Sequence, residues 1–262
     1  MKVGTDGILL GAWVDLRVVR RILDIGTGCG LIALMTAQRT EATQPDLVGV
    51  EIEAAAAAEA LENANASPWA NRIEIINAPI QSLSAHDGVS PFDLIVSNPP
   101  FFEEQLRSPA DERSLARHDL RLNADEFWTA TIGLLSKSGR VSMILPVGEF
   151  ERHLALAGSL NMRPIRLTHV RPLPGRSVKR LLVEFGFEGE LVETELIVEE
   201  IRHQYTDAFK QLTAGFYLGH PELELSRGGN PVRCMGRFRS LSRHQRDETA
   251  ARSNVEDPAN HP

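Results

Sequence analysis

Short apolar runs alternate with stretches of helical periodicity through the first 160 residues of the chain. Strands that alternate with helices in this way are typical of βαβ units, and hence of a mostly parallel sheet with helices on both faces. The predicted strands are 21–25, 47–51, 73–76, 94–97 and 141–145. The predicted helices are about 31–39, 53–66, 124–137 and 149–160, with Gly139 as the stop signal of the third.

The alternation changes after residue 160. The runs 165–170, 180–187 and 191–198 predict strands with short connections, so the sheet is expected to end in an antiparallel portion. A last helix is predicted over 205–217. We therefore expect one Rossmann-like α/β domain over residues 1–219, followed by a disordered, arginine-rich tail over 220–262, where apolar anchors are few.

The composition adds limits on location and cofactor class. The hydrophobic fraction of 42% and the charged fraction of 24% are normal for a soluble globular protein. No apolar run approaches the roughly 20 residues that span a bilayer, and the N-terminus lacks the pattern of a signal peptide. The two cysteines, Cys29 and Cys234, form neither a disulfide framework nor a metal-binding spacing. We expect a cytoplasmic monomer with no membrane anchor and no metal ion.

Charge is segregated along the chain, although the net charge is −7. Residues 163–183 hold six Arg or Lys and no acid, residues 184–200 hold seven Glu and no base, and residues 227–246 hold six Arg and no acid. Basic surface of this kind can bind a polyanion even when the whole protein is acidic. The alternative is ordinary solvated surface.

A glycine-rich turn follows the first predicted strand. Asp24 precedes Gly26, Gly28 and Gly30, and Glu51 closes the next strand. Glycines there let the backbone approach a ligand, and a carboxylate at the end of the second strand can accept both ribose hydroxyls. The spacing is not that of a dinucleotide site, and Asp24 would repel a phosphate but meet an ammonium group. The pattern therefore favours S-adenosylmethionine (SAM), against the alternative of a tight connection without a ligand.

A stiff polar and aromatic corner follows the fourth predicted strand. Its residues are Asn98, Pro99, Pro100 and Phe101, and prolines cannot continue a central strand. The Asn98 amide oxygen and the Pro99 carbonyl could accept the two N–H groups of an exocyclic amine, and Phe101 could stack on a flipped base. The prolines would hold this geometry before the substrate arrives. The alternative is a rigid turn with the phenylalanine in the core.

These motifs resemble those of a known family. The segments MKVGTDGILLGAW, LDIGTGCGLIALMTAQRT, ENANASPWANRI and SNPPFF are similar to the bacterial tRNA(Val) adenine-N6 methyltransferases, over residues 1 to about 218. The resemblance implies a class I SAM-dependent methyltransferase fold and methylation of the adenine beside the anticodon, position 37 of valine tRNA. It also implies that Thr5 and Asp6 contact the cofactor and that Asn98, Pro99, Pro100 and Phe101 form the catalytic corner.

The chain departs from the family pattern at three places. The family has a short segment ahead of MKVGTDG, so either the start lies upstream or part of the active-site cover is missing. An acid that holds the adenine amino group of the cofactor is replaced in the sequence Asn77-Ala78-Pro79, and that contact falls to the backbone of Ala78 or to water. Phe101 replaces the usual tyrosine, a substitution that guanine-N2 methyltransferases share.

Two further basic groups are candidate contacts to RNA phosphates. Three arginines spaced four apart would share one face of a helix near the corner. Three more cations lie near the predicted antiparallel end of the sheet. The first group is Arg113, Arg117 and Arg121, and the second is Arg176, Lys179 and Arg180. For the first group, a solvated helix face is the alternative.

Other functions stay open on the residues alone. The Asn-Pro-Pro-aromatic corner also serves guanine N2 in RNA, adenine N6 in DNA and the amide of a protein glutamine, because each acceptor is a planar amine. An RNA-binding homologue without activity is an alternative of a different class. An NAD-dependent oxidoreductase is disfavoured by the glycine spacing.

Overall fold

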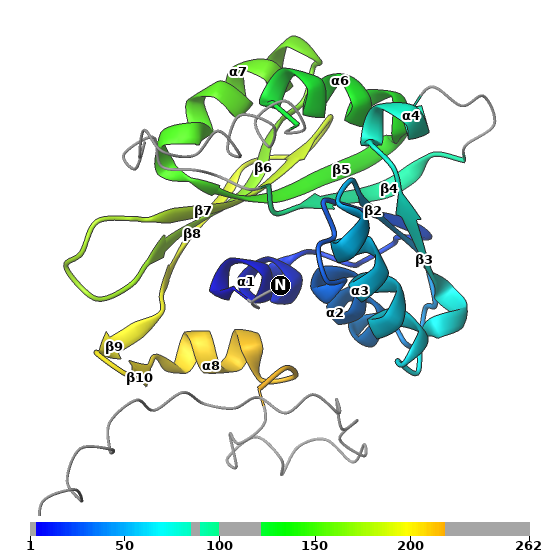
Figure 1. Ribbon diagram of the computed structural model, residues 1–262. Helices are drawn as coiled ribbons and strands as arrows, with labels where there is room; N and C mark the ends of the chain where they lie inside the picture. The colour runs from blue at the N-terminus through cyan, green and yellow to red at the C-terminus, as the bar shows by residue number, and fades with distance from the viewer. Residues whose placement is uncertain (1–3, 85–89, 100–121, 218–262) are drawn as a thin grey trace, which may run out of the picture. The chain divides into compact units, whose positions relative to one another are not determined.

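An eight-stranded sheet organises the residues that the computed structural model describes, which are 4–84, 90–99 and 122–217 (Figure 1). Its order is β3-β2-β1-β4-β5-β7-β6-β8. The strands are β1 (Arg21–Ile25), β2 (Asp46–Glu51), β3 (Ile73–Asn77), β4 (Phe92–Ser97), β5 (Leu135–Pro146), β6 (Arg163–Arg171), β7 (Arg180–Gly186) and β8 (Val192–Ile197). A separate two-stranded hairpin joins β9 (Glu199–Ile201) and β10 (Gln204–Tyr205).

The first five strands are parallel, as the sequence predicts. Burial on both faces explains why the central strands consist of continuous apolar runs rather than alternating ones. In β4, for example, Leu94, Ile95 and Val96 are all fully buried. Because these strands run in one direction, their carboxyl ends meet at one edge of the sheet, which is called the carboxyl edge below.

The far end of the sheet is only partly antiparallel. β7 pairs antiparallel with both β5 and β6, as predicted, but β8 pairs parallel with β6. The predicted antiparallel portion is therefore confirmed at β7, whereas the parallel pairing of β8 with β6 was not predicted. The chain reverses direction after β7, so β8 runs opposite to β7 and therefore parallel to β6. Because β7 is already paired with β5 and β6, β8 adds at the outer side of β6.

Helices cover both faces of the sheet (Figure 1). Phe127, Trp128 and Ala157 belong to a core with α4, α6 and α7 on one face, and Leu10, Ile32 and Phe209 belong to a core with α1, α2, α3 and α8 on the other. The helices are α1 (Thr5–Trp13), α2 (Leu31–Arg39), α3 (Ala54–Asn65), α4 (Ile80–Ser84), α6 (Ala124–Leu134), α7 (Phe150–Ser159) and α8 (Asp207–Thr213). Short 3-10 helices occupy Ala70–Arg72 and Val147–Glu149.

Two helices differ from the prediction at their ends. α6 begins as a capping box of Asn123 and Glu126 but ends at Leu134, so Gly139 does not stop it and lies inside β5. An added Cβ at Gly139 would lie 2.6 Å from the Leu135 side chain and 3.0 Å from the Phe92 carbonyl oxygen, which shows that this glycine serves packing. α8 starts later than predicted because Tyr205 belongs to β10, and it ends at Thr213 rather than at residue 217.

α1 was not predicted from the sequence, and arginine side chains hold the carbonyl groups of its last turn and the following loop. Arg39 donates to the carbonyl of Gly11 (2.8 Å), and Arg166 donates to the carbonyl of Trp13 while its guanidinium lies 3.5 Å from the Trp13 ring centroid. Carbonyl groups at a helix C-terminus lack intrahelical partners and attract cations. These contacts therefore fix the carboxyl end of α1 against α2 and β6.

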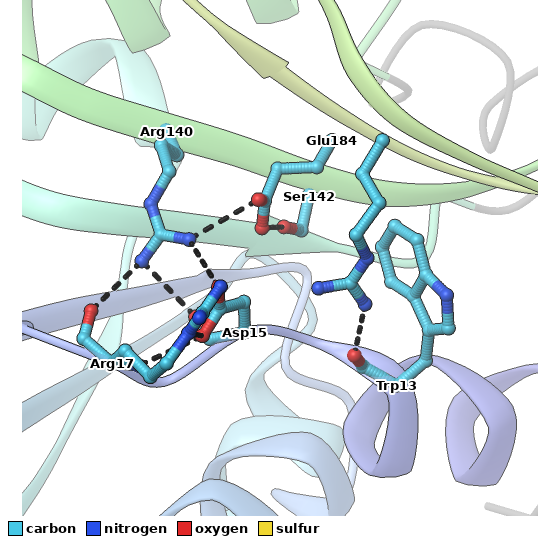
Figure 2. A network of polar contacts seen from close by, with 7 residues as sticks. Trp13, Asp15, Arg17, Arg140, Ser142 and Glu184 are labelled. Carbon is cyan, nitrogen blue, oxygen red and sulfur yellow. Dashed lines mark hydrogen bonds and ion pairs between the residues drawn. The ribbon is translucent and has the colours of Figure 1, made fainter. Parts of the chain in front are cut away.

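Arg140 of β5 extends this arrangement into a network of polar contacts (Figure 2). Its guanidinium donates to the carbonyls of Asp15 and Arg17 and pairs with the Asp15 and Glu184 carboxylates, the latter at 3.1 Å. Ser142 donates to the second oxygen of Glu184 at 2.8 Å. Burial opposes ionisation of Asp15, but hydrogen bonds from Arg17 and the charge of Arg140 outweigh it and hold the pKa of Asp15 below its usual range.

In the described ranges no helix is long and apolar enough to cross a membrane. No group of three His, Cys, Asp or Glu side chains within those ranges could hold a metal ion.

Removing Arg140 should destabilise the fold more than removing Arg17, because Arg140 pairs with a buried carboxylate and Arg17 is exposed. The Glu184 side chain is 3% exposed, so Arg140→Leu strips a buried carboxylate of its ion pair and should lower the free energy of unfolding by about 3 kcal/mol. Arg17 is 86% exposed, and Arg17→Ala should lower the free energy of unfolding far less, because exposed ion pairs contribute little. Urea unfolding of both variants measures the difference, and equal losses would contradict the assignment of Arg140 as the centre of the network.

Candidate active site

The register between β1 and β4 brings the glycine turn and the proline corner together. Ile25 pairs with Ser97, so Gly26 and Asn98 are the next residues on neighbouring parallel strands at the carboxyl edge. The Ser97 hydroxyl donates to the carbonyl of Ile25 at 3.0 Å and reinforces this pairing. Asn98 and Pro99 are half-buried. Pro100 and Phe101 lie outside the described residues, so their predicted roles stay predictions.

The glycine turn has the backbone that the sequence predicts. Gly26, Gly28 and Gly30 have positive φ angles of 71°, 60° and 83°, which side chains other than glycine rarely adopt. A Cβ added to Gly26 would have no atom within 4 Å, so this position faces open space. Gly30 is the N-cap of α2. The turn thus offers a ligand room beside Gly26 at the start of a helix.

Asp24 is an almost fully buried carboxylate with one oxygen unused. Its exposed fraction is 2%, and its Oδ2 atom accepts a hydrogen bond from the Thr27 hydroxyl at 2.6 Å. Its Oδ1 atom is buried and has no hydrogen-bond partner within the part of the chain that the structure describes. Burial raises the pKa of Asp24 to about 6, assisted by the charge of Glu51 and opposed by Thr27 and the backbone of Ala33. An ammonium group beside Oδ1 would supply the missing partner.

Glu51 is held by the backbone on both of its oxygens. Gly28 donates to Oε2 and Glu53 donates to Oε1, each at 2.9 Å. A carboxylate has about four lone-pair sites, so each oxygen can still accept one hydroxyl of a ribose. The carboxylate is thereby oriented before any ligand binds.

The backbone of Ala78 offers only one kind of group for the predicted adenine contact. Its N–H donates to the carbonyl of Glu51 at 3.1 Å, and the Asn77 amide donates to the same carbonyl at 2.8 Å. An adenine amino group needs an acceptor, so the predicted contact would have to use the Ala78 carbonyl.

The N-terminal helix lies against the corner. Gly7 is buried, and a Cβ added to it would lie 3.2 Å from the Leu31 side chain and 3.9 Å from the Asn98 amide nitrogen. Thr5 is exposed. Asp6, predicted as a cofactor contact, pairs with Arg180, predicted as an RNA contact, at 2.8 Å.

Three groups that shape this region were not singled out from the sequence. The Thr27 hydroxyl satisfies one oxygen of Asp24, Gly7 gives α1 its close approach to Asn98, and Tyr205 lines a cavity beside Asp6. Spacing could have indicated Gly7, because Gly7 and Gly11 are four apart and form one flat face of a helix. Of the predicted RNA contacts, Arg113, Arg117 and Arg121 lie outside the described residues, and Arg176, Lys179 and Arg180 lie at or just before the start of β7.

Comparison with known proteins agrees with this geometry. The family model "Methyltransferase small domain" matches residues 4–122. A tRNA1(Val) (adenine(37)-N6)-methyltransferase of Bacteroides thetaiotaomicron is 41% identical over 219 residues, which are 83% of this chain and 91% of that protein. The enzyme of the same name from Haemophilus influenzae is 42% identical and is covered to 92%. This chain belongs to the tRNA1(Val) (adenine(37)-N6)-methyltransferase family.

Solved structures support the fold of this methyltransferase independently. A predicted O-methyltransferase from Agrobacterium tumefaciens superposes with a TM-score of 0.61 at 22% identity, over 80% of this chain and 96% of that one. TrmK of M. capricolum, solved with S-adenosyl-homocysteine, superposes with a TM-score of 0.51 at 10% identity, over 73% and 72%. The predicted fold, a Rossmann-like class I methyltransferase fold, is thereby confirmed.

The residues at the carboxyl edge fit the family's cofactor, SAM. The unused Oδ1 atom of Asp24 suits an ammonium group, the oriented Glu51 carboxylate suits a ribose diol, and Gly26 leaves the backbone open between them. The individual contacts stay predictions.

Asp24→Asn should stabilise the methyltransferase in the absence of SAM. Because the pKa of Asp24 in the folded state is above its ordinary value of 3.8, its stabilising contribution is complete only below pH 3.8 and is lost as the pH rises through about 6. Removing the charge should raise the free energy of unfolding at pH 7.5 by as much as about 3 kcal/mol, with little gain at pH 4. Urea unfolding at the two pH values measures this.

Asp207 provides a matched control, because its side chain is 82% exposed and Asp207→Asn should change stability by less than about 0.5 kcal/mol. Asp24→Asn should also lose the thermal stabilisation that SAM gives the wild type. If Asp24→Asn lowered the free energy of unfolding at pH 7.5, the charged carboxylate would not destabilise the protein without SAM, and the prediction would be wrong.

Proposed function

We propose that this protein transfers a methyl group from SAM to the exocyclic N6 atom of an adenine in tRNA, at the position that names its relatives, adenine 37 of tRNA1(Val). The observation that carries the proposal is the pairing of Ile25 with Ser97, which sets Asn98 and Pro99 beside the open space at Gly26. A methyl donor at the turn and an amine at the corner would then share one site.

On the donor side, the chain's residues bind and orient. Bound SAM supplies a methyl group on a positively charged sulfur. Asp24 would accept the ammonium group, Glu51 the ribose hydroxyls, and the Ala78 carbonyl the adenine amino group. Thr5 would border the donor from the first turn of α1.

On the acceptor side, the corner prepares a weak nucleophile. The adenine amine is a poor nucleophile because its lone pair is delocalised into the ring. The Asn98 amide oxygen and the Pro99 carbonyl would accept its two N–H groups and favour the form in which the lone pair stays on nitrogen. The nitrogen then forms a bond to the methyl carbon as the carbon–sulfur bond breaks, and it afterwards releases one proton to water. Positioning supplies most of the rate.

Residues outside the described ranges, together with cations at the carboxyl edge, complete the proposed site. Phe101 would stack on the flipped adenine and Pro100 would stiffen the corner. Arg113, Arg117 and Arg121 would contact RNA phosphates, as would Arg176 and Lys179 at the carboxyl edge. We also propose that residues 1–219 form the catalytic domain, that the arginine-rich residues 220–262 add non-specific RNA affinity, and that one chain suffices without a metal ion.

The activity itself can be tested with unmodified tRNA. Incubation with SAM, digestion and mass spectrometry should give N6-methyladenosine, and tRNA1(Val) should be the best substrate. N2-methylguanosine instead would move the acceptor to guanine, which the phenylalanine at position 101 also permits. The absence of any methylated nucleoside, with SAM bound, would leave only an RNA-binding role.

Asn98→Ala should abolish turnover and spare the donor site. Removing one preorganised acceptor should lower kcat by at least about 100-fold, while the Kd of SAM stays within a few-fold. Asn71→Ala is the matched control, because Asn71 is exposed next to the amino end of β3, at the opposite edge of the sheet. Single-turnover kinetics and calorimetry measure the two quantities. If SAM binding were lost in the Asn98 variant, the corner would belong to the donor site instead.

A further inference from the structure

A cavity of about 400 Å³ opens at the carboxyl edge beyond the first turn of α1. It is separate from the glycine turn, because its walls come from α1, the ends of β6 and β8, the start of β7 and the β9–β10 hairpin. Its polar lining residues are Asp6, Lys179, Arg180, Glu199 and Tyr205. Thr5, which would also border the donor, and Asp6, which was predicted as a cofactor contact, lie in its wall on α1, but the other lining residues have no part in binding the donor or the amine.

The cavity borders the proposed catalytic corner. Asp6 lines it, and the next residue, Gly7, approaches the Asn98 amide. Arg180 pairs with Pro146 at the end of β5, and β5 pairs with β4, so Arg180 is two strands away from β4, which leads into Asn98. Two strand spacings correspond to about 10 Å. A chain of nucleotides with its adenine at Asn98 could therefore place a neighbouring nucleotide here.

The lining suits a nucleotide rather than a purely apolar ligand. Lys179 and Arg180 supply two cations for a phosphate, and Asp6 and Glu199 supply acceptors for a base amino group or a ribose hydroxyl. Tyr205 is 36% exposed, and its ring stacks on Phe209 at a centroid distance of 4.6 Å and an angle of 25°. A ring held in this way offers a fixed aromatic surface, on which unpaired RNA bases commonly stack.

Backbone hydrogen bonds hold the walls together. Val198 and Glu199 donate to the carbonyls of Arg171 and Pro172 (2.9 and 3.0 Å), and Lys179 donates to the carbonyl of Val170 (2.9 Å). The loop between β6 and β7 is thereby tied to β6 and to the hairpin that carries Tyr205. The cavity is thus a built feature of the fold, with its cations and its aromatic ring on connected backbone.

We propose that this cavity binds a nucleotide adjacent to the methylated adenine, with its base stacked on Tyr205 and its phosphate at Lys179 and Arg180. The inference rests on the proposed function and adds a second recognition point on the same RNA. Without RNA, Arg180 pairs with Asp6 in a partly exposed ion pair, so binding of a phosphate would replace a weak partner of Arg180 with a stronger one. Contact with both sites selects RNA in which the nucleotide beside the target is unpaired.

The test uses an unmodified anticodon stem-loop RNA of tRNA1(Val) and two derivatives, each lacking the base on one side of the target adenine. Tyr205→Leu should raise the KM of the intact RNA about tenfold and leave the KM of SAM unchanged. With one of the two derivatives, the variant and the wild type should have the same KM, because the base that would stack is already absent. Tyr205→Phe, which keeps the ring, should stay within about twofold of the wild type.

A second variant tests the phosphate contact without touching the aromatic cluster. Lys179→Ala should reduce the slope of log Kd against log salt concentration by about one. Lys210→Ala is the control, because it removes the same charge on α8, where Lys210 pairs with Asp207, and the slope should not change. Fluorescence anisotropy of the same RNA gives these values.

Two outcomes overturn the inference. One is a Tyr205→Leu variant whose KM for the intact RNA matches that of the wild type, or whose KM is raised by the same factor with both base-lacking derivatives as with the intact RNA. The other is an unchanged salt slope in Lys179→Ala. Failure of the proposed function looks different, because wild-type protein would then form no N6-methyladenosine, while the anisotropy arms would still report whether the cavity holds the RNA.

Discussion

Backbone hydrogen bonds between β1 and β4 set the positions of the glycine turn and the proline corner relative to each other. The pairing of Ile25 with Ser97 brings two strand ends to the same level, and each strand then leaves the sheet through residues that cannot continue it. On β1 these are glycines with positive φ, and on β4 they are an asparagine and prolines. A slip of one residue in this pairing would turn Asn98 to the other face of the sheet, so the buried apolar residues of both strands indirectly protect the chemistry.

The N-terminal helix depends on contacts at its two ends for a similar reason. At its carboxyl end, Arg39 and Arg166 hold its carbonyls, and Arg140 holds those of the following loop. At its amino end, Gly7 approaches Asn98 and Asp6 pairs with Arg180. α1 therefore contacts the start of α2, the corner at Asn98 and the cavity beside Tyr205, although it comes before the first strand of the sheet.

The sequence predicted the parallel half of the sheet well because strands buried on both faces consist of long apolar runs. It also predicted the turn at Asp24 to Gly30. A turn that needs positive φ angles requires glycines, and glycines at this spacing after an acid are visible in the sequence. It missed α1, whose apolar residues surround most of the helix and whose glycines suggest a loop. Gly139 was wrongly predicted to end a helix. The sequence alone does not distinguish a glycine that is needed for close packing from one that ends a helix.

Long-range pairing explains the remaining differences. The sequence could not show that β8 would add parallel to β6, because that choice depends on where β7 inserts. Asp6 and Arg180 are 174 residues apart, so their pairing was invisible until the fold placed α1 at the start of β7. Asp6, predicted to contact the cofactor, and Arg180, predicted to contact RNA, are thus neighbours in the fold. Neither the N-terminal motif nor the basic run shows this in the sequence.

If Asp24 holds the ammonium group of SAM as proposed, its buried carboxylate would link the supply of methyl donor to the lifetime of the protein. A fold that carries an uncompensated charge when its pocket is empty gains free energy in proportion to the logarithm of the ligand present. When the donor is scarce, a larger fraction of the chains is unfolded at any moment and open to proteolysis. The cellular amount of this enzyme would then follow the availability of its own substrate, without any dedicated regulator.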